Sequence, residues 1–167
     1  MKVLIVEDFR ALAKGLSEVL QAQGHQVQCV VGFRNLETLL AVDVDDNDVT
    51  LTTDFDVALV DGCIEQFAEK PIEGPAVVAR FAKDGVKCFG ISTEEEKNKL
   101  MISNGAIDGV NKAVAFVALV GSIVSVEEIR ADDKSAIQRI HQLRADFNSD
   151  ANKPLRKRCD ALVMQHS

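Results

Sequence analysis

Short runs of apolar residues alternate along this chain with segments in which apolar residues recur every three or four positions. The apolar runs predict five strands, at Lys2–Val6, Val27–Val31, Val57–Val60, Val86–Ile91 and, more weakly, Ala106–Val110. Strands that are apolar throughout and separated by helices are typical of a parallel sheet with both faces covered. The pattern therefore predicts an α/β fold with a doubly wound, five-stranded parallel sheet.

Helices are predicted in the segments between these strands. The first helix begins near Arg10, and Gly24 is well placed to end it, because glycine readily adopts the backbone conformation that closes a helix. A second, short helix is predicted from the spacing of Leu36, Leu39 and Leu40.

The third helix follows a loop with two prolines and a glycine at 71–75 and ends near Gly85. The fourth helix covers Glu94–Asn104, and the fifth runs from about Val114 toward Arg130. Residues 41–54 are acidic and have no clear period, so we expect an extended connection or a small hairpin there.

The last part of the chain is predicted to be a helical extension. Five strand–helix units complete a domain at about residue 130, so the prediction is a domain at residues 1–130 and an extension at residues 131–167. The apolar stripes of the extension must be buried on the same chain or against a second copy, and we favour a dimerisation or docking element that includes the fifth helix. The stripes are Ile137, Ile140, Leu143 and Phe147, and Leu155, Cys159, Leu162 and Val163.

Composition excludes several classes of function. A formal net charge of -7 argues against direct binding to DNA or RNA, which is driven by an excess of Lys and Arg. The N-terminus lacks the long apolar region of a secretory signal, and the longest apolar run, Ala113–Val126, falls short of the ~20 residues that span a bilayer. Four dispersed cysteines without a CxxC pair suit a reduced, cytoplasmic protein.

Chemically active side chains stand where the predicted strands end. In open parallel sheets, ligands bind outside the carboxyl ends of the strands. The residues at those ends are Glu7 and Asp8 after the first strand, Asp61 after the third, Ser92 and Thr93 after the fourth, and Lys112 after the fifth.

These residue types suggest a self-phosphorylating aspartate. Three carboxylates in one crevice repel one another unless a cation relieves them, and Mg²⁺ is the hard ion that takes one or two carboxylates together with a phosphate oxygen. Lys112 supplies a positive charge for the other oxygens of a phosphoryl group on Asp61. Because the chain has neither nucleotide-binding loop, GxGxxG or GxxxxGK[ST], the phosphoryl donor must be another molecule.

Four segments at these strand ends resemble the conserved blocks of the CheY-like family of response-regulator receiver domains. They are Leu4–Phe9, Ala58–Asp61, Gly90–Thr93 and Gly105–Lys112. Each block alone is a weak signal, but four in the right order, each at a strand end, form a specific constellation. The resemblance covers roughly residues 1–126.

The resemblance implies a flavodoxin-like sheet with strand order 2-1-3-4-5 and a role in two-component signal transduction. It implies that Glu7, Asp8 and Asp61 bind Mg²⁺ together with the backbone carbonyl of Cys63. Asp61 would take its phosphoryl group from a sensor histidine kinase or a phosphotransfer protein. Lys112 and the hydroxyls of Ser92 and Thr93 would form the catalytic and switching set, with Ser92 on a phosphoryl oxygen.

Two positions depart from the family pattern. Ala113 follows Lys112 where the family usually has proline, and Gly109 stands where the fifth strand normally holds a switching aromatic residue. The usual coupling of a hydroxyl to an aromatic flip therefore cannot operate unchanged. The loop after Asp61 is also longer than usual, so the surface that signals phosphorylation is expected to be remodelled.

Simpler explanations exist for single residues. Asp61 alone could be a turn residue before Gly62, and Ser92 could cap a helix in a capping box with Glu95. The acidic residues between Asp43 and Asp54 match some positions of a calcium loop but lack its glycine and final glutamate, so a solvated connection is expected.

Three functions remain open. The first is a phosphorylation-controlled interaction module that is not an enzyme on external substrates but carries only self-phosphotransfer and dephosphorylation chemistry. The second is a pseudo-receiver scaffold that binds proteins or dimerises without phosphorylation. The third, a metal-dependent phosphatase, ranks lowest because no general acid is apparent beside Asp61.

Overall fold

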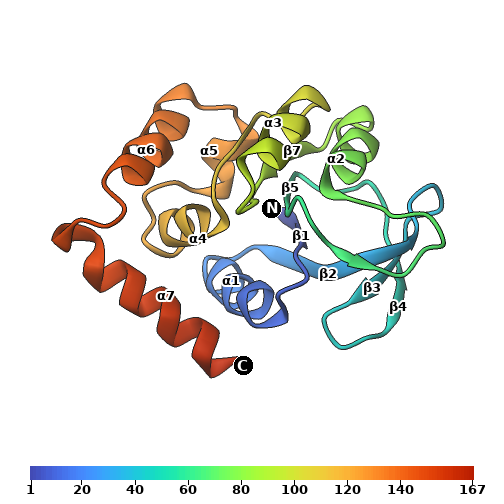
Figure 1. Ribbon diagram of the computed structural model, residues 1–167, viewed down its shortest axis with the longest axis horizontal. Coiled ribbons are helices and arrows are strands. Elements are labelled where there is room, and N and C mark those ends of the chain that lie inside the picture. Colours follow the sequence, from blue (N-terminus) through green and yellow to red (C-terminus); the bar gives the residue numbers. More distant parts are fainter.

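A computed structural model describes all 167 residues and contains one mixed sheet with helices on both faces (Figure 1). Five of its parallel strands lie in the order β2-β1-β5-β7-β8, which is the predicted order 2-1-3-4-5, and the short β6 Glu65–Gln66 pairs in parallel with β2 off this path. Their bounds are β1 Lys2–Val6, β2 Gln26–Asn35, β5 Val57–Val60, β7 Lys87–Gly90 and β8 Asp108–Gly109. The doubly wound α/β fold expected from the apolar runs is confirmed.

Alternate residues of the central strands bury against opposite layers of helices. In β1, Val3 and Ile5 belong to one apolar cluster, whereas Leu4 and Val6 belong to the other. Side chains of a strand point alternately to the two faces, so a strand buried on both faces is apolar throughout. The helices are α1 Arg10–Ala22, α2 Gly74–Lys83, α3 Glu95–Ser103, α4 Lys112–Val120, α5 Val126–Arg130, α6 Lys134–Ala145 and α7 Lys153–Gln165, with a 3₁₀ turn at Asp150–Asn152.

The predicted second helix, at Leu36, Leu39 and Leu40, is wrong. Residues 36–39 form a turn that leads into a β-hairpin, β3 Leu40–Asp43 and β4 Asp48–Thr50, which extends the sheet antiparallel beside β2. Leu39 has a positive φ of 57° and packs in the same apolar cluster as Phe33 of β2. Pairing with the edge of β2 thus overrides a helical spacing that is only five residues long. The small hairpin expected within residues 41–54 is confirmed.

The predicted fifth helix is divided in two. α4 ends at Val120, and α5 begins at Val126 after a turn in which Ser122 has a φ of 54°. Ser125 then starts α5 with a capping box, its hydroxyl accepting the N–H of Glu128. The apolar run continues through the turn because the residues on both sides of it are buried, so periodicity alone did not reveal the break.

The apolar stripes of the C-terminal helices are buried or partly buried on this chain. α7 lies beside α1 and α4, and α6 packs against α4 (Figure 1). Ile140, Leu143 and Cys159 belong to the same buried cluster as Val3 and Ile5 of the central strand. None of the helices combines the length and apolarity needed to cross a membrane.

Replacing Ile140 with alanine should lower the free energy of unfolding by about 2 to 5 kcal/mol, because Ile140 is 1% exposed within that shared cluster. Urea denaturation followed by circular dichroism measures the change. Leu100→Ala, at a position 49% exposed on α3, serves as the control and should change stability by no more than about 0.5 kcal/mol. Because the C-terminal helices share this cluster with the central strand, the protein should unfold in one transition, and a separate early transition of these helices would contradict the prediction.

Candidate functional site

Three carboxylates from two neighbouring parallel strands meet at the carboxyl edge of the sheet. Glu7 and Asp8 follow β1, and Asp61 follows β5; one carboxylate oxygen of each lies within 4.8 Å of the others. β1 and β5 pair in parallel with Val6 opposite Val60, so their next residues emerge side by side. The convergence predicted for these three residues is therefore present.

The ammonium group of Lys112 completes this cluster. Its Nζ donates to Oδ2 of Asp61 at 2.6 Å and to Oε1 of Glu7 at 2.9 Å. Lys112 is the first residue of α4, just beyond β8, and the side chain of Asn111 caps that helix by accepting the N–H of Ala113. The cap fixes the start of α4 and so directs the lysine across the sheet edge toward the acids.

Burial sets the electrostatics of the cluster. The Glu7 side chain is fully buried, and this burial, together with the charge of Asp61, raises the pKa of Glu7 to about 7 despite the opposing Lys112. Burial likewise raises the pKa of Asp61, although Lys112 works against it. Burial lowers the pKa of Lys112, but the charge of Glu7 and the bonds to both acids outweigh it, so the pKa lies above its usual value. The lysine therefore stays charged while Glu7 is poised to lose a proton near neutrality.

One oxygen in this cluster lacks a partner. Oε2 of Glu7 is buried without any hydrogen bond, whereas Oε1 accepts from Lys112 and from the N–H of Phe9. A buried carboxylate oxygen needs a proton or a cation, and a set of hard carboxylate oxygens suits Mg²⁺. The residues present thus fit a divalent cation on chemical grounds.

The two hydroxyl residues occupy different environments. Ser92 is buried, and its Oγ lies 2.6 Å from where a Cβ on Gly62 would stand, so the residue after Asp61 has to lack a side chain. Thr93 is exposed. The capping box expected between Ser92 and Glu95 is wrong: α3 starts after Glu94, and the Ser92 hydroxyl accepts the N–H of Glu94 in a local turn.

Asn98 is a buried polar residue that sequence reasoning missed. Its side-chain amide forms hydrogen bonds with both the N–H and the carbonyl of Ser92. Nothing in the sequence marks it, because it lies within a polar helix where asparagine is unremarkable.

The loop that follows Asp61 is held close to the start of α2. A Cβ on Gly74 would lie 2.1 Å from the carbonyl oxygen of Asp61, so only glycine permits this approach. Cys63 belongs to the same loop. Its backbone nitrogen lies 3.5 Å from Oδ1 of Asp61, and its thiol donates a hydrogen bond to Oε1 of Glu94. The predicted role of the Cys63 carbonyl as a metal ligand stays a prediction.

The acidic hairpin offers no second site. Asp45, Asp46 and Asp48 pair with basic side chains of α1 and β2, and Asp43 accepts backbone N–H groups of its own turn. The basic partners are Lys14, Arg10 and Arg34 respectively. These pairs neutralise the hairpin, in agreement with the expected solvated connection.

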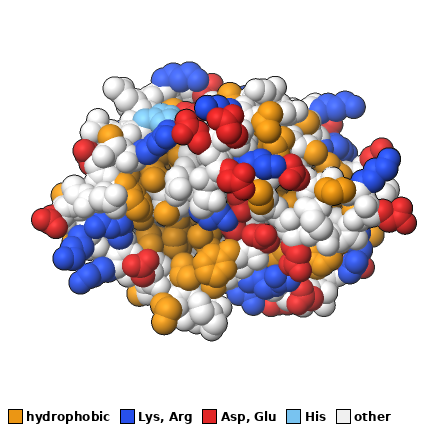
Figure 2. Space-filling view, viewed as in Figure 1, with side chains coloured by type: hydrophobic (Ala, Val, Ile, Leu, Met, Phe, Trp, Pro, Cys, Tyr) orange, Lys and Arg blue, Asp and Glu red, His pale blue; other side chains and the backbone are white.

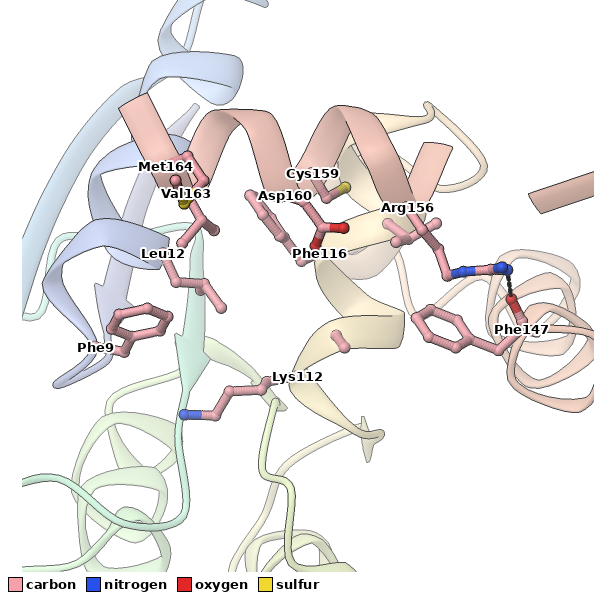
Figure 3. Close-up of a pocket in the computed structure, with 12 residues that line it drawn as sticks. Phe9, Leu12, Lys112, Phe116, Phe147, Arg156, Cys159, Asp160, Val163 and Met164 are labelled. Atoms are coloured by element: carbon pink, nitrogen blue, oxygen red, sulfur yellow. Dashed lines mark hydrogen bonds between the residues drawn. The ribbon is translucent and has the colours of Figure 1, made fainter. Parts of the chain in front are cut away.

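An apolar groove of about 550 Å³ adjoins the acidic cluster, between α1, α4 and α7 (Figure 3). The side chain of Lys112 lines one side of the groove. At the other side, the guanidinium group of Arg156 stacks on the Phe147 ring, 5.6 Å from the ring centre. Figure 2 shows apolar side chains gathered over this part of the surface. The apolar lining includes Phe9, Leu12, Ala113, Phe116, Val117, Val163 and Met164.

Comparison with solved structures shows what this arrangement resembles. The receiver domain of a Francisella response regulator superposes with a TM-score of 0.54 at 15% identity, covering 80% of this chain and 98% of that domain. The chain has the receiver fold. A CheY-like receiver domain protein from Methanospirillum hungatei matches with a TM-score of 0.54 at 19% identity, covering 80% of this chain and 97% of that one.

A third receiver-fold match is the N-terminal domain of a response regulator/sensory box/GGDEF protein from Carboxydothermus hydrogenoformans. Its TM-score is 0.54 at 18% identity, covering 82% of this chain and 99% of that domain. No protein-family model and no curated protein matches the sequence. At these identities, the likeness establishes the receiver fold, and the function rests on the site.

Glu7 should make the stability of this receiver-fold protein depend on pH in magnesium-free buffer. Because the folded state raises the pKa of Glu7 from 4.5 to about 7, its favourable contribution is complete below pH 4.5 and is lost as pH rises to about 7. The full loss amounts to about 3 kcal/mol.

Urea titrations between these pH values test the dependence. Glu7→Gln, which cannot ionise, should remove this part of the pH slope, whereas Glu37→Gln at an exposed position should keep it. Equal slopes in the wild type and in Glu7→Gln would contradict the assignment.

Proposed function

We propose that this protein is a response regulator of two-component signal transduction that accepts a phosphoryl group on Asp61 and signals through altered protein–protein interaction. The observation that supports the proposal most directly is the Lys112 ammonium group shared by Asp61 and Glu7 at the carboxyl edge of a receiver fold. A turn residue or a helix cap would have no need of a partly buried lysine from the start of α4, 51 residues away.

The acidic cluster would hold Mg²⁺ through Glu7, Asp8 and Asp61, with the backbone carbonyl of Cys63 as a further ligand. The partnerless Oε2 of Glu7 favours this assignment. When bound, the ion would neutralise charge between the carboxylates and the oxygens of an incoming phosphoryl group.

The chain's own residues have distinct roles in the transfer. A carboxylate oxygen of Asp61 forms a bond to phosphorus as the bond between phosphorus and the donor's leaving atom breaks, and the donor leaves with that electron pair. Lys112, kept protonated by its acidic neighbours, would follow the charge from the carboxylate to the phosphoryl oxygens. The Ser92 hydroxyl would donate to one of those oxygens, and the exposed Thr93 would complete the switching set.

The donor would be the phosphohistidine of a sensor histidine kinase or a phosphotransfer protein, acting in the cytoplasm. Residues 1–130 would form the phosphoacceptor domain, with residues 131–167 as its extension. The protein would carry only its own phosphotransfer and dephosphorylation, and its target would be another protein. A homodimer through α4 and the extension would use the groove surface, where Phe147 and Val163 of the apolar stripes stay partly exposed while Ile140 and Leu143 are buried on this chain.

Incubation with Mg²⁺ and acetyl phosphate should add the mass of one phosphoryl group to the wild type, with acetate leaving. Asp61→Asn should abolish the addition, because an amide oxygen cannot form the acyl phosphate. Asp150→Asn, at an exposed carboxylate remote from the cluster, should leave it intact. Intact-protein mass spectrometry measures the product, and a wild type that stays unlabelled with acetyl phosphate and with phosphorylated kinases would refute the proposal.

A pseudo-receiver scaffold is the second candidate, and the apolar groove favours it. The groove offers a protein-binding surface that exists without phosphorylation. Gly109 and Ala113, at the positions where the family pattern has an aromatic residue and a proline, also suit a domain that no longer switches in the usual way.

Magnesium separates the two candidates. Mg²⁺ at about 100 times its dissociation constant should stabilise the phosphoacceptor form by about 2.7 kcal/mol, since the ion binds only the folded chain. Thermal unfolding in Ca²⁺-free buffer, with and without Mg²⁺, measures this stabilisation. Glu37→Gln is the control variant and should keep it. Loss of the stabilisation in Asp61→Asn would support the metal site, whereas a wild type that is insensitive to Mg²⁺ would favour the scaffold.

A further inference from the structure

We propose that Asn98 is a positioning residue for phosphoryl transfer, which acts by holding the backbone of Ser92 so that its hydroxyl stays against Gly62, the residue that follows Asp61. The proposal rests on the phosphoacceptor function above. Asn98 lies outside the four segments that resemble the receiver family and outside the acidic cluster. It depends on three observations: a paired hydrogen bond, a space reserved by two glycines, and the place of the Ser92 hydroxyl.

Asn98 binds both polar groups of the Ser92 backbone. Its Oδ1 accepts the N–H of Ser92 at 3.1 Å, and its Nδ2 donates to the Ser92 carbonyl at 2.9 Å. The Asn98 residue is only 6% exposed, so water does not compete for these bonds. Ser92 follows β7 and Asn98 lies in α3, so the amide ties the end of the strand to the helix.

Two glycines of neighbouring strands make room for this amide. A Cβ on Gly90 of β7 or on Gly109 of β8 would each lie 2.9 Å from Oδ1 of Asn98. Any side chain at position 109 would therefore displace the amide from Ser92. Gly109, which stands where the family pattern has a switching aromatic residue, thus leaves the space that the Asn98 amide fills.

The Ser92 backbone determines where its hydroxyl lies. Oγ accepts the N–H of Glu94 at 3.2 Å and stands 2.6 Å from the Cβ position of Gly62, the residue that follows Asp61. This hydroxyl, packed against the residue after the acceptor, can meet a phosphoryl oxygen only while the backbone at the end of β7 keeps this path. Because misplacement by about 1 Å can slow a reaction by about 100-fold, losing the Asn98 amide should reduce transfer without touching the metal ligands.

A double-mutant cycle on the phosphorylation rate tests the proposal. Asn98→Ala should slow labelling by acetyl phosphate at saturating Mg²⁺ by about 10- to 100-fold, with the Mg²⁺ dissociation constant unchanged. In a Ser92→Ala background, the same substitution should have no further effect, because Asn98 acts through Ser92. Asn104→Ala, at an exposed asparagine that caps the same helix, is the matched control and should label at the wild-type rate.

Two further measurements keep the test decisive if Asn98→Ala folds poorly. Gly109→Ala should displace the amide and slow labelling in the same direction. Hydrogen exchange at the Ser92 N–H, which needs neither metal nor phosphoryl group, should be faster in both variants than in Asn104→Ala. If the wild type is labelled but Asn98→Ala changes neither the labelling rate nor the exchange at Ser92, this proposal alone is overturned. The same holds if Asn98→Ala slows labelling equally in the Ser92→Ala background. A wild type that never labels would overturn the phosphoacceptor function itself.

Discussion

The salt bridges that Lys112 forms with Glu7 and Asp61 hold the site together. Two buried carboxylates a few ångströms apart would repel each other strongly in a medium of low polarity, and a single ammonium group bonded to both relieves that repulsion. The contact is available only because β1, β5 and β8 run in the same direction and end on one edge of the sheet. The topology thus decides whether these side chains can form a site.

The remaining geometry follows from close approaches around that contact. Gly62 leaves room for the Ser92 hydroxyl, and Gly74 lets α2 approach the carbonyl of Asp61. Asn98 occupies the space that Gly109 leaves open. Three carboxylates and an ammonium group thus gather at one edge of the sheet, with the Ser92 hydroxyl against the residue that follows Asp61.

The periphery of the fold differs from the simple pattern of alternating strands and helices. A hairpin, β3 and β4, takes the place of the predicted second helix, and α7 covers α1 and α4 while leaving the apolar groove open beside the acidic cluster. The acidic side chains of the hairpin are tied to α1 and β2 by Arg10, Lys14 and Arg34. These additions surround the site without altering the strand ends that form it.

The sequence by itself determined the parallel strands, their order through the family resemblance, and the convergence of Glu7, Asp8, Asp61 and Lys112. The carboxyl ends of parallel strands share one edge, so local patterns suffice for the strands and for the gathering of these side chains, whereas the strand order came from the resemblance alone. The hairpin after β2, the break between α4 and α5, and the role of Asn98 were decided only by the tertiary structure. Each depends on contacts between distant segments, such as an open strand edge or the space above two glycines, and such contacts leave no periodic signal in the sequence.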